Sequence, residues 1–502
     1  MVSPDMVSPA WVVTPSGRSR AIHVNATATG GGVAELLHRM VPAQAAAGFG
    51  AGWLVIGGDA EFFDTTKRMH HLLHGRTDPS ALDAATMIRY RAVLAPQAAW
   101  LAERVTPRDV VCLHDPQTLG LAPVLKRAGV PVVWHCHIGT SRHADPGPAA
   151  MWRAFAPELS VLDAVVTTLP EYAPPIPLAR RHVITPAVDL SAAKNRPLTG
   201  EAVAARLAAI GLTAEYPERA ERAERAERAE RAERAERAER AGRAEPAEPA
   251  QLAELAQPAE AGEPAGAAGA AARGAAAGAV VEHLAPLPPG ARVVAQVSRW
   301  DPLKDMPGVL GLIPLLPSDV HVVLVGADPA DIPDDPEGAE VLRQVRAARD
   351  RLPVADRARV HLVLTSLRQD EEAALVVNAV QRRADVVLQK SLEEGFGLAA
   401  TEAMAKGRPV VAGAVGGLRH QIVDGHSGVL VDPHDPAAVA SAVRRLLDDP
   451  ALRDRLGAGA QARVSAAYLL PRLLSDYERL LRSLAGRPAG DDVVKEEPWP
   501  TR

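Results

Sequence analysis

The sequence feature that most constrains this chain is the stretch 391–417, SLEEGFGLAATEAMAKGRPVVAGAVGG. An apolar run of strand length, ADVVLQK, ends just before it, and a turn containing Gly395 and Gly397 leads into a helical pattern over residues 398–406. A glycine and a proline then predict the end of that helix, and a second short apolar run follows. Strand, glycine turn, helix and strand in this order form half of a nucleotide-binding α/β unit.

Two carboxylates, Glu394 and Glu402, stand eight residues apart in this stretch, the first in the turn and the second within the helix. Because Glu402 precedes Lys406 by four residues, an ion pair on the helix surface is an alternative role for it. The two acids around a glycine turn resemble the E-x7-E signature of retaining glycosyltransferases of the two-domain GT-B type. In that superfamily both acids hold a nucleotide-sugar donor.

Length and composition limit the class of protein. A chain of 502 residues is too long for one ordinary core and predicts two domains with additions. The formal net charge of −5 gives no strong field for nucleic acid or an anionic membrane. We interpret Cys112 and Cys136 as reduced core thiols, because both stand in apolar runs and no secretory signal is evident. No window reaches the roughly 20 apolar residues of a membrane span, so we expect a cytoplasmic protein.

The first part of the chain alternates strand and helix patterns. Residues 1–19 are polar and proline-bearing, which predicts a loose leader, and residues 20–26 predict the first strand. Gly30, Gly31 and Gly32 then precede a helical pattern, so the backbone can approach a ligand closely and the helix N-terminus can attract an anion. A tight turn is the alternative role of these glycines. Further strands are predicted at 52–58, 109–113, 130–136, 163–167 and 182–185, and helices at about 63–73 and 81–101.

Polar side chains follow two of these strands. Asp115 comes after the strand 109–113, and His137 follows the strand 130–136. The carboxyl ends of parallel strands are where α/β sheets bind ligands, so we predict that Asp115 and His137 contact substrate. His135 and His137 stand two residues apart and share one face of an extended segment. A structural role is the alternative for either histidine, and metal binding is not expected because no third ligand with suitable spacing is evident.

Between residues 198 and 278 the composition changes completely. The unit Glu-Arg-Ala repeats over residues 218–241, and an Ala/Pro/Gly/Glu-rich stretch follows. Each Glu has an Arg four positions later, and such pairs stabilise a helix by ~0.2–0.5 kcal/mol each. The repeat predicts a charged helical rod of ~36 Å at ~1.5 Å per residue, and its continuation predicts a disordered linker. We interpret the segment as an expansion tolerated in a surface loop, with a partner-binding element as the alternative.

A second set of strand patterns follows the insert, and strands alternating with helices predict a second doubly wound domain. These strands are expected at 291–298, 321–326, 361–365, 384–389 and 409–412, followed by helices at 436–467 and 471–484. The predicted organisation is a leader (1–19), an N-terminal Rossmann-like acceptor domain (20–198), a low-complexity insert and linker (199–289), a C-terminal nucleotide-sugar domain (290–468), a C-terminal helix (469–486) and a tail (487–502).

Several stretches together resemble trehalose synthases of the glycosyl-transferring kind, over roughly residues 20–198 and 290–486. They are NATATGGGVAELLH (25–38), VIGGDAEFFDTTKRMHH (55–71), LHDPQTLGLA (113–122), VVWHCHIG (132–139), QVSRWDPLKDM (296–306), DDPEG (334–338), LEEGFGLAATEAMAKGRPVVAGAVGG (392–417) and QIVDGHSGVLV (421–431). The chain departs from the family pattern Arg-Cys-His-Ile-Asp, where it has His135 to Gly139, and the Glu-Arg-Ala insert is foreign to the family.

The resemblance implies a GT-B fold, in which two Rossmann-like domains face a cleft, with the charged helical insert added. It assigns Arg299 and Lys304 to the diphosphate of the donor, whose leaving group gains negative charge in the transition state. Glu402 would accept hydrogen bonds from ribose hydroxyls, and Glu394 from hydroxyls of the transferred sugar. The backbone amides expected beside them are those of Gly395, Phe396, Gly397 and Leu398.

From the opposite domain, the resemblance brings the loop 30–32 to the diphosphate and His137 to the sugar near its reacting carbon. The implied reaction transfers glucose from ADP-glucose or UDP-glucose to free glucose with retention, by a front-face route in which the leaving phosphate helps deprotonate the acceptor. No cofactor or divalent metal is expected, because Arg, Lys and helix N-termini supply positive charge. The implied partners are a nucleotide-sugar donor and a sugar acceptor, without nucleic acid or membrane, and a homodimer is compatible with the sequence.

Two rival functions stay open on the sequence. The first is a GT-B transferase with another acceptor, such as a sugar phosphate, a lipid or a polysaccharide. The second is a non-catalytic sugar-nucleotide-binding scaffold that uses the charged rod as its interaction element. Loss of Arg299, Lys304 or Glu402 would favour the scaffold, and all three are present.

Overall fold

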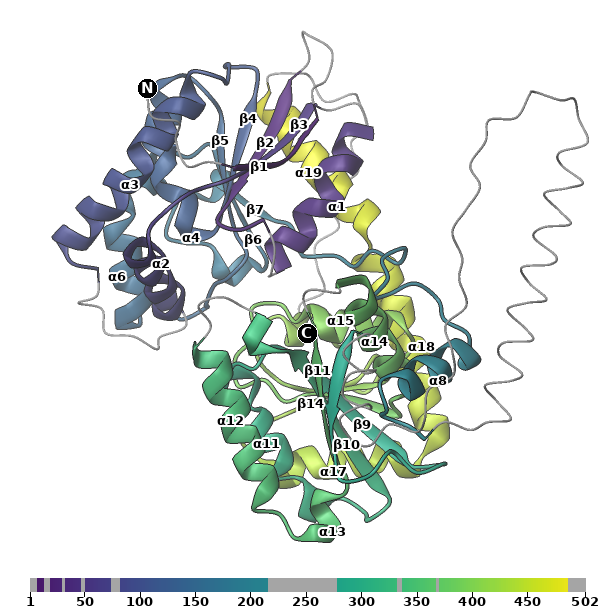
Figure 1. The fold of residues 1–502 in the computed structure, drawn as a ribbon. Helices are drawn as coiled ribbons and strands as arrows, with labels where there is room; N and C mark the ends of the chain where they lie inside the picture. Colours follow the sequence, from purple (N-terminus) through teal and green to yellow (C-terminus); the bar gives the residue numbers. More distant parts are fainter. Residues whose placement is uncertain are drawn as a thin grey trace, which may run out of the picture.

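The computed structural model describes residues 7–12, 19–28, 32–46, 50–73, 82–214, 278–331, 336–366 and 370–485. These form two α/β lobes that lie side by side (Figure 1). The predicted charged rod at 218–241 lies outside the described residues, as do Gly30 and Gly31 and the predicted tail. No helix of the described ranges is long and apolar enough to cross a membrane.

The first lobe is built on a seven-stranded sheet of order β1-β3-β2-β4-β5-β6-β7. Its strands are β1 (Val7–Val12), β2 (Arg20–Asn25), β3 (Gly50–Val55), β4 (Val110–His114), β5 (Val132–Cys136), β6 (Ala164–Thr167) and β7 (Arg181–Val183). All pairs are parallel except β1 with β3, which is antiparallel. The prediction of a loose leader over 1–19 is therefore wrong for 7–12, because this segment adds a strand to the open edge of β3.

Helices cover both faces of this sheet, as the near-continuous burial of its strands requires. Val111 and Leu113 of β4 belong to one apolar cluster with Tyr90, whereas Val110 and Cys112 belong to a second cluster on the other face. The helices are α1 (Gly32–Ala46), α2 (Ala60–Leu73), α3 (Ala84–Ala102), α4 (Asp115–Thr118), α5 (Ala122–Arg127), α6 (Pro146–Ala154) and α7 (Ala156–Val161). Both cysteines are buried free thiols, as predicted.

The second lobe has a seven-stranded sheet of order β14-β13-β12-β9-β10-β11-β8, in which only β8 is antiparallel. Its strands are β8 (Ala279–Glu282), β9 (Arg292–Val297), β10 (Val320–Ala327), β11 (Val360–Thr365), β12 (Val386–Gln389), β13 (Val410–Gly413) and β14 (Val429–Val431). Its helices are α8 (Gly200–Ala209), α11 (Met306–Leu310), α12 (Pro336–Asp350), α13 (Val354–Arg357), α14 (Asp370–Arg383), α15 (Leu398–Ala405), α16 (Leu418–Gln421), α17 (Pro436–Asp448) and α18 (Pro450–Ala467). Two doubly wound lobes confirm the predicted fold class.

The predicted insert, 199–289, is too wide at both ends. Helix α8 and strand β8 fall inside that range, and both belong to the second lobe. Val203 and Leu207 of α8 are buried in the same apolar cluster as Ala279 of β8. In the sequence, these few apolar residues stand among polar residues and alanines, so composition alone does not separate α8 and β8 from the repeat.

The C-terminal helix α19 (Leu470–Leu484) returns to the first lobe, where it appears in yellow beside α1 (Figure 1). A β-bridge between Val188 and Leu469 leads into it. Leu473 and Tyr477 are fully buried there, in the cluster that covers one face of the first sheet. The chain therefore crosses between the lobes twice, and the first lobe is incomplete without α19.

Candidate active site

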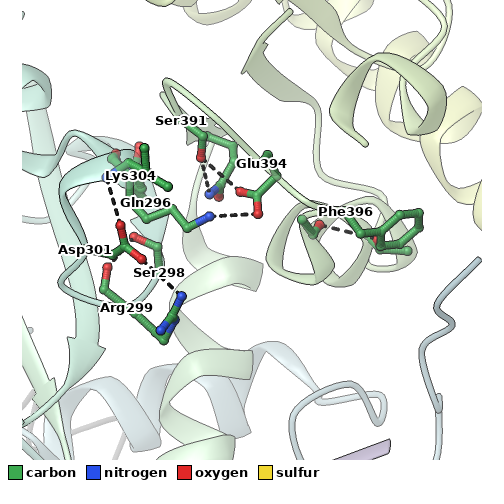
Figure 2. A network of polar contacts seen from close by, with 12 residues as sticks. Gln296, Ser298, Arg299, Asp301, Lys304, Ser391, Glu394 and Phe396 are labelled. Carbon is green, nitrogen blue, oxygen red and sulfur yellow. Dashed lines mark hydrogen bonds and ion pairs between the residues drawn. The ribbon is translucent and has the colours of Figure 1, made fainter. Parts of the chain in front are cut away.

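The loop between β12 and α15 carries Glu394 at the carboxyl end of the second sheet. The Lys304 ammonium lies 2.7 Å from Oε1 of Glu394, and the hydroxyl of Ser391 donates to Oε2 at 3.0 Å (Figure 2). Both charged side chains are largely withdrawn from solvent, with Lys304 13% and Glu394 9% exposed. Opposite charges at this distance and burial form a strong pair that holds the Glu394 carboxylate in one place.

Lys304 is held in position by a short turn after β9. It ends a single turn of 3-10 helix, Pro302–Lys304, which begins where the Asp301 carboxylate accepts from the Leu303 amide at 2.8 Å. The buried Gln296 joins this turn to the Glu394 loop, because its amide donates to the Lys304 carbonyl at 2.7 Å and accepts from the Lys390 amide at 3.0 Å. Sequence reasoning missed Gln296, although a polar residue in an apolar strand is a usable signal.

Arg299 occupies a different environment from Lys304. It exposes 65% of its side chain and pairs with Asp301 at 3.0 Å (Figure 2). The two predicted diphosphate ligands thus flank one turn, with Lys304 directed at Glu394 and Arg299 directed at Asp301. Arg299 is open to a ligand arriving from solvent, whereas Lys304 already has an anionic partner.

The glycine turn sets the start of helix α15. Gly397, with φ of +96°, is the residue before the helix, a backbone conformation that glycine adopts readily. Phe396 is buried against Tyr468, with ring centroids 5.6 Å apart, and thereby anchors the turn. The amides at the start of α15 lack intrahelical partners and carry a partial positive charge. Gly32 opens α1 directly opposite, since a Cβ added to it would lie 3.9 Å from a methyl of Leu398.

Glu402 is buried between the lobes, and its surface ion pair with Lys406 does not form. The Lys406 ammonium instead donates to the Glu402 backbone carbonyl at 3.1 Å, to Asn195 and to Gln381. Oε1 of Glu402 lies 3.6 Å from the ammonium of Lys194, which also contacts Glu35 of α1. Burial raises the pKa of Glu402 and lowers the pKa of Lys406 to about 7.

In the first lobe, the Asp115 side chain contacts the backbone of His137. Oδ1 of Asp115 accepts from the His137 backbone amide at 2.8 Å. Burial raises the pKa of Asp115 to about 7. The backbone at Asp115 has a φ of +60°, which is uncommon for a residue other than glycine. The Asp115 carboxylate thus fixes the position of the His137 backbone, and its role as a substrate contact stays a prediction.

His137 belongs to a cluster that spacing along the chain did not reveal. Ring nitrogens of His114, His135 and His137 all lie within 4.8 Å of one another, so a third imidazole does stand beside the predicted pair. Nδ1 of His114 and Nε2 of His137 are 2.8 Å apart, at hydrogen-bond distance. Two ligands of a tetrahedral zinc ion would have nitrogens ~3.3 Å apart, and the rings of His135 and His137 are stacked at 3.7 Å. His114 and His137 are therefore joined by a hydrogen bond, and the His135 ring is stacked on His137.

The two halves of the site meet across the lobes. The Tyr172 hydroxyl donates to the Glu394 carbonyl at 3.1 Å, and a Cβ added to Gly395 would lie 3.6 Å from the carbonyl of His137. Two polar contacts join the lobes nearby: Nε2 of His420 lies 2.7 Å from a carboxylate oxygen of Glu171, and Arg142 forms an ion pair with Glu393. The predicted residues Glu394, Gly395 and His137 are thus brought together, whereas Arg299 pairs with Asp301 and Glu402 with Lys194.

Comparison with known proteins identifies the family of this chain. The family model described as trehalose synthase, N-terminal domain, matches residues 23–174, and the model described as glycosyl transferases group 1 matches residues 285–463. The trehalose synthase of Rubrobacter xylanophilus is 30% identical over 480 residues, which cover 93% of this chain and 91% of that protein. The chain belongs to the trehalose synthase family. It is therefore a glycosyltransferase of trehalose metabolism.

Other relatives support the same family and fold. The trehalose synthase of Pyrococcus horikoshii is 29% identical over 478 residues, covering 94% of this chain and 91% of that protein. Among solved structures, the α,α-trehalose 6-phosphate synthase of Burkholderia multivorans has a TM-score of 0.62 at 16% identity, covering 93% of this chain and 99% of that one. The sucrose-phosphate synthase of Thermosynechococcus elongatus has a TM-score of 0.59 at 17% identity, with the same coverage. These likenesses show the GT-B fold of this trehalose synthase family member.

The departures from the expected Arg-Cys-His-Ile-Asp pattern have local structural counterparts. His135, where arginine is expected, is buried, and its Nδ1 hydrogen-bonds the Tyr477 hydroxyl of α19. Gly139, where aspartate is expected, lies against Tyr172, and a Cβ added there would meet the Tyr172 Cβ at 2.6 Å. An aspartate at 139 therefore does not fit beside the tyrosine that reaches Glu394.

Proposed function

We propose that this enzyme transfers glucose from ADP-glucose or UDP-glucose to free glucose, with retention of the anomeric configuration, to form trehalose. The observation that carries the proposal is the Lys304–Glu394 pair at the start of α15, which faces the loop of His137 from the opposite lobe. Relatives named trehalose synthase, which match almost the whole chain, support glucose as donor sugar and acceptor.

The donor diphosphate is assigned to the second lobe. Lys304 is shared between Glu394 and the incoming phosphates, and the exposed Arg299 turns from Asp301 to a phosphate, which it can engage with two parallel hydrogen bonds. The N-termini of α15 and α1 meet near Gly32 and Leu398, so their partial positive charges add to this field. These groups stabilise the charge that develops on the leaving group, and no step requires a divalent metal.

The sugar and the ribose are assigned to the two acids. Glu394 accepts hydrogen bonds from hydroxyls of the transferred glucose, with amides of Gly395 to Leu398 beside it. Glu402 accepts from the ribose hydroxyls, and Lys194 holds its carboxylate in place. Although burial raises the pKa of Glu402, donor hydroxyls and Lys194 both favour its ionised form.

The reaction itself is a front-face substitution at the anomeric carbon. The bond from this carbon to the diphosphate oxygen breaks, and a bond to the acceptor oxygen forms on the same face. The proton of the acceptor hydroxyl passes to the leaving phosphate, so no protein base is needed. His137 hydrogen-bonds the sugar near the reacting carbon. In this assignment, residues 20–198 form the acceptor domain and residues 290–468 the donor domain.

The proposal is tested by a matrix of donors and acceptors. Release of nucleoside diphosphate is measured with ADP-glucose and with UDP-glucose, each without acceptor, with glucose and with glucose 6-phosphate. We expect rapid release with one donor only when glucose is present, and a product whose two anomeric protons have the α configuration by NMR. Preference for glucose 6-phosphate would assign the enzyme to another acceptor class. Binding of donor without any transfer would favour the scaffold function.

A further inference from the structure

A chain of buried hydrogen bonds runs across the first sheet and ends at His137. The side-chain oxygen of Gln44, on α1, lies 3.0 Å from Nε2 of His23, on β2. Nδ1 of His23 lies 3.0 Å from Nε2 of His114, at the end of β4. Nδ1 of His114 then lies 2.8 Å from Nε2 of His137, just after β5. The strands β2, β4 and β5 are neighbours in the sheet, so this chain of hydrogen bonds crosses the sheet toward the carboxyl ends of its strands.

The structure places the Gln44 side-chain oxygen against Nε2 of His23 and leaves the Gln44 side-chain nitrogen without a partner, and this placement sets the direction of every hydrogen bond in the chain. An amide oxygen can only accept, so Nε2 of His23 must carry the proton. A neutral imidazole has one N–H and one lone pair, so Nδ1 of His23 accepts from His114. The same reasoning makes Nδ1 of His114 accept from Nε2 of His137. Nδ1 of His137 is left as a lone pair, and among the described residues it has no hydrogen-bond partner.

The surroundings keep these rings neutral and fixed. Gln44, His23 and His114 are almost fully buried. Burial lowers the pKa of His23 to about 4 and that of His137 to about 3. The backbone of His137 is held by Asp115 at 2.8 Å, and its ring is stacked on His135 at 3.7 Å. Because the His137 backbone, one face of its ring and its Nε2 are all held in place, its Nδ1 points in one fixed direction.

We infer that Gln44, His23 and His114 are positioning residues that fix the tautomer of His137, with Nε2 protonated and Nδ1 a hydrogen-bond acceptor for a sugar hydroxyl. This inference rests on the proposed function, which places His137 beside the reacting sugar. An acceptor at this position selects for a hydroxyl that can donate, and it adds no positive charge beside the anomeric carbon. A histidine free to exchange tautomers would offer that acceptor for only part of the time.

The direct test is the protonation pattern of His137, read by ¹⁵N NMR on enzyme labelled at histidine and assigned with His137→Asn. In the intact enzyme near neutral pH, we expect the proton on Nε2 and an unprotonated Nδ1. A proton on Nδ1, or on both nitrogens, overturns the inference. This readout does not depend on turnover, so it stands apart from the proposed reaction.

The second test removes the first link at a distance from the substrate. Gln44→Met keeps the side-chain length and removes the acceptor, and we expect a protonated Nδ1 to appear at His137 and kcat to fall about 3- to 10-fold. His182→Asn is the control, because His182 of β7 takes no part in these hydrogen bonds. It should change neither the His137 protonation pattern nor kcat. An unchanged His137 signal in Gln44→Met contradicts the inference. If Gln44→Met fails to fold, the same test is made by comparing the His137 protonation pattern of His23→Leu with that of the intact enzyme. If the His137 tautomer changed and turnover did not, the chain of hydrogen bonds from Gln44 to His137 would stand. The role of His137 in the proposed reaction would then be rejected.

Discussion

The hydroxyl of Tyr172 donates a hydrogen bond to the backbone carbonyl of Glu394 at 3.1 Å and so joins the two lobes at the loop that bears the acid. Tyr172 is largely buried, and burial raises the pKa of its hydroxyl. The hydroxyl therefore stays protonated and available as a donor. Because the contact falls on the loop itself, the position of the Glu394 carboxylate depends on a residue of the opposite lobe.

Replacing Tyr172 with Phe should weaken catalysis without unfolding the protein. A hydrogen bond of this kind contributes about 0.5–1.5 kcal/mol, so we expect kcat/KM to fall roughly 3- to 10-fold, measured by diphosphate release. Tyr468→Phe is a matched control, because its hydroxyl donates at the same distance of 3.1 Å to the His420 carbonyl within one lobe. Equal losses in the two variants would contradict a special role for the contact between the lobes.

Gly139 makes the room that Tyr172 needs. A methyl group at 139 would overlap the Tyr172 side chain, so Gly139→Ala should cost about 1–3 kcal/mol and lower kcat/KM. Activity in Gly139→Ala should then be insensitive to Tyr172→Phe, which a double-mutant cycle measures. Gly200→Ala serves as the control, since nothing lies within 4 Å of a Cβ there. Additive losses in the cycle would show that Gly139 acts independently of Tyr172.

Removing either cation of the proposed diphosphate site should reduce turnover. Lys304→Ala or Arg299→Ala should lower kcat by ~10²-fold or more, because one such donor contributes ~2.7–4 kcal/mol to the transition state. Lys304→Ala also leaves the buried Glu394 without its partner, so its thermal midpoint should fall, whereas that of Arg299→Ala should not. Arg343→Ala, on the exposed face of α12, is the control. Normal turnover in both site variants would remove the assignment.

The sequence predicted the elements that depend on local pattern. The two sheets follow from apolar runs separated by glycine turns, and Glu394 and Gly397 stand in the turn that follows one such run, whereas the role of Lys304 came from the resemblance. The resemblance predicted that residues of both lobes face one substrate, and the structure places Glu394 and His137 on facing loops.

What the sequence did not predict depends on contacts between distant segments. Gln44, His23 and His114 come from three elements that only the sheet order brings together. Tyr477 reaches His135 because α19 returns to the first lobe, and no local pattern encodes that return. The alternative role for Glu402, an ion pair with Lys406 across one helical turn, is absent because the Lys406 ammonium donates to buried amide oxygens of Asn195 and Gln381. Local spacing cannot weigh such competition.

Buried neutral histidines should make the protein unstable in acid. The pKa of His23 falls from an ordinary 6.5 to about 4 in the fold, so between these values the unfolded chain binds the extra proton. The contribution of His23 to the free energy of unfolding is therefore fully present above about pH 6.5 and declines as the pH falls toward about 4. On going from about pH 7.5 to about 5, this residue alone accounts for a loss of about 2 kcal/mol.

The measurement is the fall in thermal midpoint between those two pH values. His23→Asn should show a smaller fall than the intact enzyme, because it has no proton to take up at this position. His426→Asn, at an exposed histidine, should show the same fall as the intact enzyme. An equal fall in His23→Asn would mean that other groups, such as His114 and His135, dominate the acid response.

Deleting residues 215–277 and inserting a short Gly/Ser bridge should leave the fold and turnover nearly unchanged. The segment offers almost no large apolar side chains that could be buried in either lobe. Its two flanks are anchored independently, since Thr213 forms a β-bridge with Leu287 and the Gly278 carbonyl accepts from the Ser366 amide at 2.9 Å. The closing entropy of the shortened loop changes by only ~0.6 kcal/mol per doubling of length.

The end point of that deletion is decisive, because Gly278 has a φ of +87° and packs where a side chain would strike the backbone of Ala373. A longer deletion, 215–282, removes this glycine and the strand β8, whose residues pair with β11. We therefore expect the longer deletion to lower the thermal midpoint and the shorter one to preserve it. If the shorter variant kept its circular dichroism spectrum and lost turnover, the insert would act on closure of the lobes or access of substrate. If it kept turnover and lost a protein captured by the intact chain, the insert would serve a separate partner, as the scaffold alternative requires.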